Sequence, residues 1–80
     1  MRIKAFLLIN AELGKEGEVV KELRKLENVK EANEVYGVYD IVAKIEVNSP
    51  EELKETVLAE IRSIDGVHST LTLIVTNNQP

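Results

Sequence analysis

A carboxylate and a flexible turn residue lie together in the segment Gly37-Val38-Tyr39-Asp40. The glycine is expected to permit a tight hairpin with open backbone N–H groups, and Asp40 adds a negative charge beside them. Backbone N–H groups bind a carboxylate and a carboxylate binds an ammonium, so this turn could hold an α-amino acid. The alternative is that Asp40 only caps the turn.

Two hydroxyl groups, those of Thr70 and Thr72, lie two residues apart in a predicted strand. This spacing places both on one face of a sheet, which the alternation of the strand predicts to be the face that carries Asp40. Both threonines are therefore predicted to contribute to the ligand site. The alternative is that they reflect strand propensity alone.

The sequence holds little that could perform catalysis, because it has one His and no Cys. His68 precedes Ser69, and neighbours on a strand point to opposite faces, so the two cannot form a Ser–His pair. We expect an exposed sheet histidine and no catalytic residue. The alternative, a small isomerase, would need a pocket centred on His68.

Metal and phosphate sites are also not predicted. The acidic residues of the first helix alternate with lysines, which is typical of a solvated, ion-paired face, and Glu51 and Glu52 suit the first turn of the second helix. Gly14 and Gly17 do not have the spacing of a phosphate-binding loop. We therefore predict turn glycines, no metal and no cofactor.

The length and charge of the chain limit its class. Eighty residues form one domain, predicted over residues 1–76 with a flexible tail at 77–80. The formal charge is −4, and no Lys/Arg cluster stands apart from acidic neighbours, so direct binding to nucleic acid is not expected. The longest apolar run, Ala5–Ile9, is far short of the roughly 20 residues that span a bilayer, which predicts a cytoplasmic protein.

Apolar periodicity and turn residues predict six elements. Ser49 is expected to cap the second helix, with Pro50 at its first position and Glu52 completing a capping box. In chain order the elements are a central strand at 3–9, a helix spanning 18–26, an edge strand at 29–36, a strand at 39–47, a helix starting at 50, and a strand at 67–75.

The order β-α-β-β-α-β predicts an α+β, ferredoxin-like sandwich, with two helices on one face of a four-stranded antiparallel sheet. The last strand is expected to turn Val67, Leu71, Leu73 and Val75 inward. An apolar patch on the helix-free face predicts a dimer interface, which a small chain without disulfides would use for stability. The alternative is scattered surface apolar residues. The predicted interface residues are Phe6, Leu8, Val42 and Ile74.

The predicted topology also separates the two halves of the ligand site. Asp40 and Thr70 are expected two strands apart and at opposite ends of the sheet, roughly 15 Å from each other in one subunit. One small ligand cannot bridge that distance. If both residues contact the same amino acid, they must come from different subunits, so binding and assembly would be linked.

Four segments resemble the effector domain, or RAM domain, of the Lrp/AsnC family of feast/famine regulators. The resemblance implies a sheet-mediated dimer, octamers or similar rings, and amino-acid effectors between dimers. Gly37, Tyr39 and Asp40 match the family's effector turn, and Thr70 and Thr72 match its last-strand threonines. The segments are Ala5–Ile9, Leu26–Ala32, Gly37–Asp40, and Ile64–Val67 with Thr70-x-Thr72.

Family members usually carry a DNA-binding domain before this module, whereas Met1 begins directly at the first strand, so the chain resembles the stand-alone version. The function expected from the resemblance is an amino-acid-sensing module that modulates full-length Lrp/AsnC regulators by co-assembly. A structural assembly partner without a ligand and an ACT-like regulatory domain are the alternatives. The ACT-like alternative would pair its sheets side by side rather than face to face.

Overall fold

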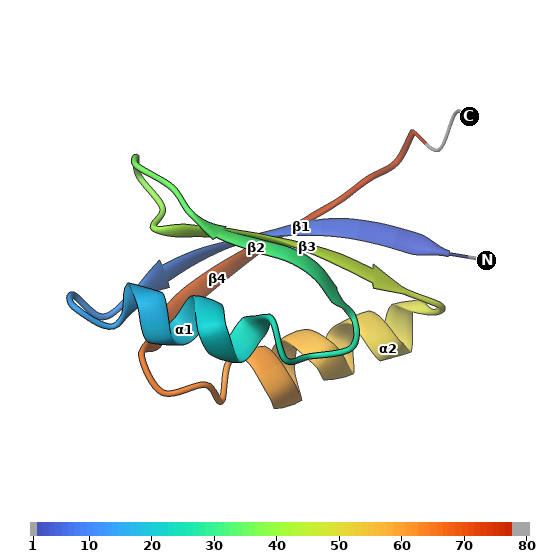
Figure 1. Cartoon of the computed structure of the whole chain (residues 1–80). Helices are drawn as coiled ribbons and strands as arrows, with labels where there is room; N and C mark the ends of the chain where they lie inside the picture. The colour runs from blue at the N-terminus through green and yellow to red at the C-terminus, as the bar shows by residue number, and fades with distance from the viewer. Residues whose placement is uncertain (1, 78–80) are drawn as a thin grey trace.

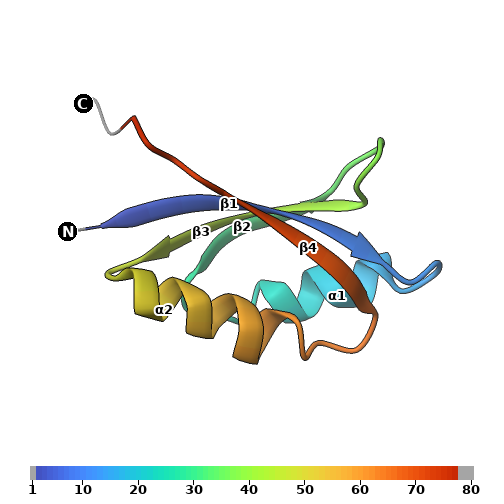
Figure 2. The same cartoon turned by 180° about the vertical axis from the view of Figure 1, so that it is seen from behind.

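Four antiparallel strands in the order β2-β3-β1-β4 form one sheet in this computed structural model, which describes residues 2–77. The helices cover one face of the sheet and leave the other face bare, as the two opposite views in Figures 1 and 2 show. The predicted ferredoxin-like α+β sandwich is confirmed. Its elements are β1 (Ile3–Ala11), α1 (Glu16–Leu23), β2 (Val29–Glu34), β3 (Ile41–Val47), α2 (Pro50–Glu55), a π-helical continuation of α2 named η1 (Thr56–Ile61), and β4 (Val67–Ile74).

Alternation along β1 and β3 builds the core as predicted. Leu7 and Ile9 of β1 are fully buried and pair with Ala43 and Ile41 of β3, also fully buried. The helices add stripes at helical spacing, because residues three and four apart share one helix face. These stripes consist of Val19, Val20 and Leu23 in α1, and Leu53, Val57 and Ile61 in α2 and η1.

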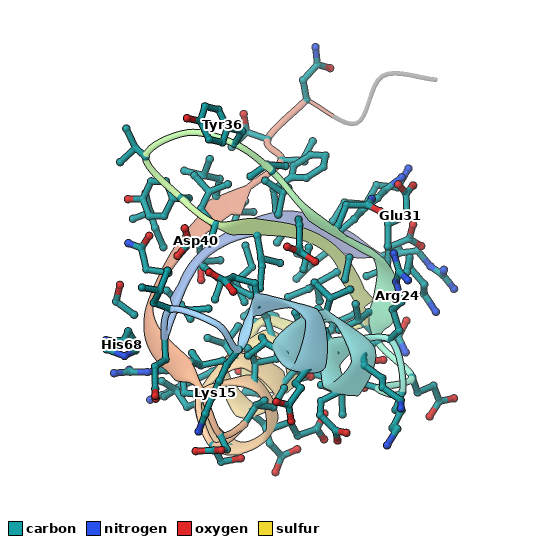
Figure 3. All side chains as sticks on the ribbon, turned by 60° about the vertical axis from the view of Figure 1, so that its left-hand side comes forward. Lys15, Arg24, Glu31, Tyr36, Asp40 and His68 are labelled. Atoms are coloured by element: carbon teal, nitrogen blue, oxygen red, sulfur yellow. The ribbon has the colours of Figure 1, made fainter. Side chains whose placement is uncertain are left out.

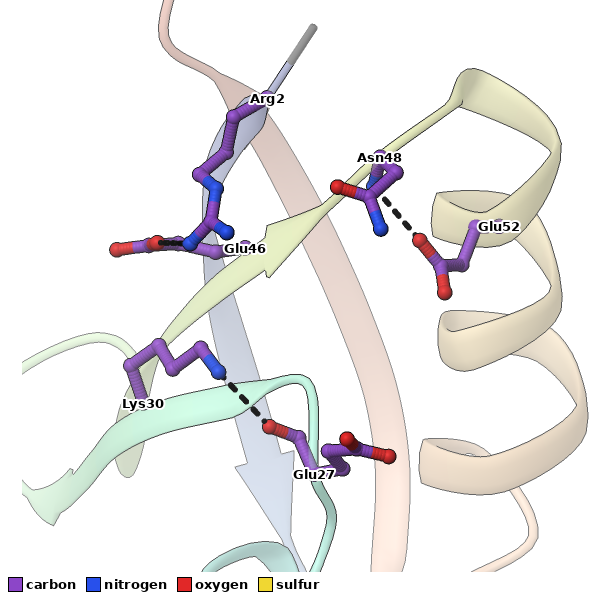
Figure 4. Close-up of polar contacts among 6 residues, drawn as sticks. All are labelled: Arg2, Glu27, Lys30, Glu46, Asn48 and Glu52. Carbon is purple, nitrogen blue, oxygen red and sulfur yellow. Dashed lines mark hydrogen bonds and ion pairs between the residues drawn. The ribbon is translucent and has the colours of Figure 1, made fainter.

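The start of α2 has the cap that the sequence predicts. The backbone N–H of Glu52 donates to Ser49 Oγ at 3.0 Å, and the N–H of Asn48 donates to Glu52 Oε1 at 2.6 Å (Figure 4). The first bond satisfies an N–H group that the start of the helix would leave free, and the second ties the Glu52 side chain to the residue before the cap. This fixes α2 against the edge of the sheet.

The prediction for the faces of β4 is wrong beyond Val67. Val67 pairs with Ala11, but the register then shifts, so that Thr70 pairs with Ile9 and Thr72 with Leu7. Paired residues share a face, and Ile9 and Leu7 are core residues. The bulge inserts one extra residue near His68 and inverts the alternation that follows.

As a result, the side chains of β4 exchange faces relative to the prediction. Thr70, Thr72 and Ile74 lie on the helix side of the sheet, whereas Leu71 and Leu73 lie on the bare side, opposite Leu8 and Phe6. Leu71 and Leu73 are about half exposed.

Gly66 closes the turn before β4 in a conformation that other residues rarely adopt. Its φ is +101°, and an added Cβ would lie 3.0 Å from Val19 Cγ2 and 3.2 Å from Lys15 Cβ. The Gly66 carbonyl also accepts a hydrogen bond from the Glu12 N–H at 2.7 Å. Beside it, a hydrogen bond from the Lys15 ammonium to Asp65 raises the pKa of Lys15 above its ordinary value.

Gly66→Ala is therefore expected to destabilise the fold by about 2 kcal/mol, from the left-handed backbone and the crowding of Val19 together. Gly37→Ala is the matched control, because Gly37 lacks a positive φ and its Cβ would meet nothing within 4 Å. Urea unfolding of both variants measures the difference. Equal free energies of unfolding would contradict this account of Gly66.

Of the predicted flexible tail 77–80, only Asn77 is among the described residues, and residues 78–80 lie outside them. Within residues 2–77, no helix is long and apolar enough to cross a membrane.

Candidate functional site

Asp40 stands at the base of the hairpin between β2 and β3, with its backbone and side chain both bonded. Its N–H donates to the Ile9 carbonyl at 3.0 Å, and its own carbonyl accepts from the Val35 N–H at 2.8 Å. One carboxylate oxygen, Oδ2, accepts from the Ala11 N–H at 2.9 Å, where β1 lies opposite the bulge in β4. In the described chain, the carboxylate makes no other hydrogen bond, so it keeps acceptor capacity for a ligand.

The rest of the hairpin projects from the sheet. Tyr36 is fully exposed, Val38 is 87% exposed, and Tyr39 is partly buried. In Figure 3, Tyr36 stands at the outer end of the hairpin and Asp40 at its base. Gly37 does not have the left-handed backbone expected of a tight glycine turn, so its small size rather than its φ distinguishes it here.

The two predicted halves of the ligand site are not brought together within the subunit. β3 and β4 both run antiparallel to β1, so Asp40 and Thr70 lie near the same end of the sheet. Thr70 pairs with Ile9 in register, and the Asp40 N–H donates to the Ile9 carbonyl. The expected separation of 15 Å with opposite ends is therefore wrong, and two strand spacings give roughly 10 Å. Thr70 faces the helix side, however, while alternation from the buried Ile41 turns Asp40 to the other side.

The bare face carries an apolar patch around β1 and β4. In register, Phe6 lies opposite Leu73, and Leu8 lies between Val42 and Leu71. The prediction of an apolar bare face holds for Phe6, Leu8 and Val42, but Ile74 lies on the other side, and Leu71 and Leu73 were missed. The bare-face patch thus consists of Phe6, Leu8, Val42, Leu71 and Leu73.

Charged side chains surround this patch. The Arg2 guanidinium lies 2.8 Å from Glu46 Oε1 (Figure 4). This hydrogen bond lowers the pKa of the Glu46 carboxyl, against the opposing effect of burial, and Lys4 and Lys44 add to the lowering. Lys44 lies opposite Phe6 in register, so the patch has a polar rim. An apolar centre with a polar rim is typical of a protein interface.

A groove of about 690 Å³ opens on the helix side, between α2 and the free edge of β4. Most of its lining is aliphatic, with Lys54 and Arg2 adding positive charge. Thr72 and Ile74 line it, so one predicted ligand residue and one predicted interface residue belong to this groove. We name this space the α2–β4 groove; its lining is Arg2, Ile3, Pro50, Leu53, Lys54, Val57, Leu58, Thr72, Ile74, Val75 and Thr76.

In the part of the chain that the structure describes, no side chain pairs with His68 in a catalytic arrangement. His68 is exposed (Figure 3), and the neighbouring Ser69 Oγ accepts from Asn10 Nδ2 at 3.4 Å. Among residues 2–77, no group of three or more His, Cys, Asp or Glu side chains could hold a metal ion.

Sequence comparison identifies related regulators. The model of the Lrp/AsnC ligand binding domain family matches residues 4–79. The HTH-type transcriptional regulator FL11 of Pyrococcus abyssi is 45% identical over 71 residues, which are 89% of this chain and 46% of FL11. A homocitrate synthase of Sulfurisphaera tokodaii is 42% identical over 57 residues, 71% of this chain but 12% of the enzyme. The chain spans about half the length of the curated regulators it matches.

Several solved structures are similar to this chain in fold. FFRP-DM1 has a TM-score of 0.88 at 36% identity, covering 91% of this chain and 97% of that one. E. coli AsnC has a TM-score of 0.90 at 30% identity, covering 95% of this chain and 52% of that one. The L-Met complex of the Neisseria meningitidis regulator NMB0573, with a TM-score of 0.84 at 18% identity over 95% of this chain and 51% of that one, is similar in fold.

Proposed function

The chain belongs to the Lrp/AsnC ligand-binding domain family, and from that premise we propose that it is a cytoplasmic, amino-acid-sensing module that acts as a dimer and in larger assemblies, and not an enzyme. The observation that carries the proposal is the state of Asp40. Its carboxylate is held in place by one backbone N–H and otherwise lacks a partner among residues 2–77. A fixed carboxylate at the base of an exposed hairpin is suited to an α-ammonium group.

The bond from Ala11 gives Asp40 this role because it orients the carboxylate before a ligand arrives. A preoriented group loses little conformational entropy on binding. Gly37 and Tyr39 lie in the same hairpin, and we propose that they contribute to the same site. The ligand class is supported by the Neisseria regulator of the same fold, which was solved in complex with L-methionine.

The proposed role of Thr70 and Thr72 differs from that of Asp40. Since they face the helix side, they cannot meet the ligand of Asp40 in their own subunit. We propose that they contact an effector only when it is held by another subunit of a larger assembly, such as a ring of dimers. Binding would then strengthen assembly, and assembly would strengthen binding.

Calorimetric titration of the intact oligomer against the twenty amino acids tests the sensing proposal. At least one amino acid is expected to bind saturably, with its affinity rising at protein concentrations that favour assembly. A non-amino carboxylic acid of the same side chain is the control, because it lacks the ammonium that Asp40 would bind. Absence of heat with all twenty, in protein shown to be oligomeric, would remove the sensing function.

The second candidate is a structural partner that completes assemblies without a ligand, and the apolar bare-face patch alone would support it. Mass measurements with and without amino acids separate the two, because the assembly of a sensor responds to its effector. An ACT-like module would pair sheets edge to edge through β4 and leave Phe6 and Leu8 exposed.

For the sensor, we propose co-assembly with full-length regulators of the family as its output.

A further inference from the structure

Two apolar features have no partner among residues 2–77 of their own subunit: the hairpin tip (residues 35–39) and the α2–β4 groove. Tyr36 is fully exposed and Val38 is 87% exposed, while Leu58 and Ile74 in the groove are 46% and 55% exposed. We propose that the hairpin tip of each subunit is seated in the α2–β4 groove of a second copy of the same chain. This proposal rests on the bare-face dimer and adds a contact to it.

The chemistry of the two surfaces matches. The hairpin tip has the sequence Val-Tyr-Gly-Val-Tyr and carries no charge. The groove is lined mainly by aliphatic side chains, and Lys54, which lines it, has no ion pair within the described residues. An ammonium group is attracted to the face of an aromatic ring by a cation–π interaction. Tyr36 can therefore bury its ring beside Lys54 while its hydroxyl stays near water.

A subunit cannot fill its own groove with its own hairpin. The hairpin emerges beside Ile9, which pairs with Ile41 at the start of β3, whereas Ile3 lines the groove. Six residues of strand separate Ile9 from Ile3, which is roughly 20 Å. The hairpin also rises on the side of the sheet away from the helices (Figure 1). A hairpin that occupies the groove must therefore come from another molecule.

The positions of the two features suit a two-fold dimer. The hairpin stands at the β2–β3 corner of the sheet (Figures 1 and 2). The groove is lined by residues at the start of β1 and the end of β4, which places it at the β4 corner of the opposite end. We place a two-fold axis in the plane between two facing sheets, along the diagonal that joins the other two corners. Rotation about this axis brings the hairpin corner of each subunit over the groove corner of its partner. The strands of the two sheets would then cross steeply, as in orthogonal sheet packing.

The same axis covers the bare-face patch. Leu71 and Leu73 lie on one side of β4, and Thr72 and Ile74 in the groove lie on its other side. A partner that packs on the bare face and reaches around the free edge of β4 would therefore contact both. Each subunit gives one hairpin and receives one, so the contact is closed and isologous.

Disulfide trapping tests this contact directly, because the native chain has no cysteine. Val38→Cys and Leu58→Cys, prepared as separate proteins and mixed under mild oxidation, are expected to form a covalent heterodimer. Leu13→Cys is the matched control, since Leu13 is 92% exposed in a different loop. Val38→Cys that couples to Leu13→Cys as fast as to Leu58→Cys, or only to itself, would overturn the proposal.

A second measurement separates this contact from the bare-face dimer. The double variant Tyr36→Ser/Val38→Ser should keep its fold, because both side chains are exposed, and should weaken dimerisation about 30-fold or more. An unchanged dissociation constant in a stable dimer would refute the hairpin contact and leave the bare-face dimer standing. A wild-type chain that never dimerises would refute both.

Discussion

Leu71→Asp is expected to convert the proposed bare-face dimer into a folded monomer. Leu71 lies in the bare-face patch opposite Leu8, on the side without helices, and is 45% exposed in the subunit. In a face-to-face dimer the new carboxylate would be buried without a partner in each copy, at a cost of about 3 kcal/mol or more. The dissociation constant should rise at least about 100-fold.

Sedimentation velocity and circular dichroism check this prediction together. The fold should survive, because water reaches the side chain of Leu71 in the free subunit. Leu13→Asp introduces the same charge at a 92% exposed position and should leave the mass unchanged. A Leu71→Asp protein with the mass of the wild type would show that the bare face is not the interface.

The second large effect is expected from Asp40→Asn, which separates the structural role of Asp40 from its proposed binding role. The Asn oxygen can still accept the hydrogen bond from the Ala11 N–H, so the stability should change by less than about 1 kcal/mol. The variant has no charge to bind an α-ammonium group. Loss of a hydrogen bond between charged partners should weaken effector binding by roughly 10- to 100-fold.

Calorimetry with the effector found for the wild type measures this change, and thermal unfolding measures the stability. Asp40→Ala serves as the comparison, because it removes the charge and also leaves the Ala11 N–H without its acceptor. It should lose both binding and stability. An Asp40→Asn protein that binds the effector as tightly as the wild type would eliminate Asp40 as the ammonium ligand.

Most of the fold could be predicted because it follows from local periodicity. The alternation of β1 and β3, the helical spacing of Val19, Val20 and Leu23, and the cap at Ser49 are all properties of short segments. The order of these elements then leaves few topologies, because crossover connections between parallel strands are right-handed.

The faces of β4 could not be predicted, because they depend on a pairing between distant segments. Opposite Asn10 and Ala11, β4 carries one extra residue that shifts the register, and no residue of β4 alone indicates this shift. Extending the alternation from Val67 therefore placed Leu71 and Leu73 inside and Ile74 outside. The surplus of apolar residues on both faces of β4 was the available signal, since it is typical of a strand that is covered on both sides.

The candidate site was predicted in part for the same reason. Asp40 was proposed as a ligand residue from a four-residue turn, and in the structure its carboxylate accepts a hydrogen bond from the Ala11 N–H of β1. The relation of Asp40 to Thr70 depends on the three-strand register, which set the two residues on opposite faces. The α2–β4 groove was not predicted, because it is formed by the start of β1, the end of β4 and α2 together.

The mass of the wild-type protein in solution, measured by sedimentation equilibrium at micromolar concentration, tests most directly the claim that a second copy covers the bare face of the sheet. We expect twice the subunit mass or an even multiple of it, with a shift toward larger assemblies when the effector is added. A single subunit mass throughout the micromolar range, with Leu71 and Phe6 accessible to solvent, would contradict it.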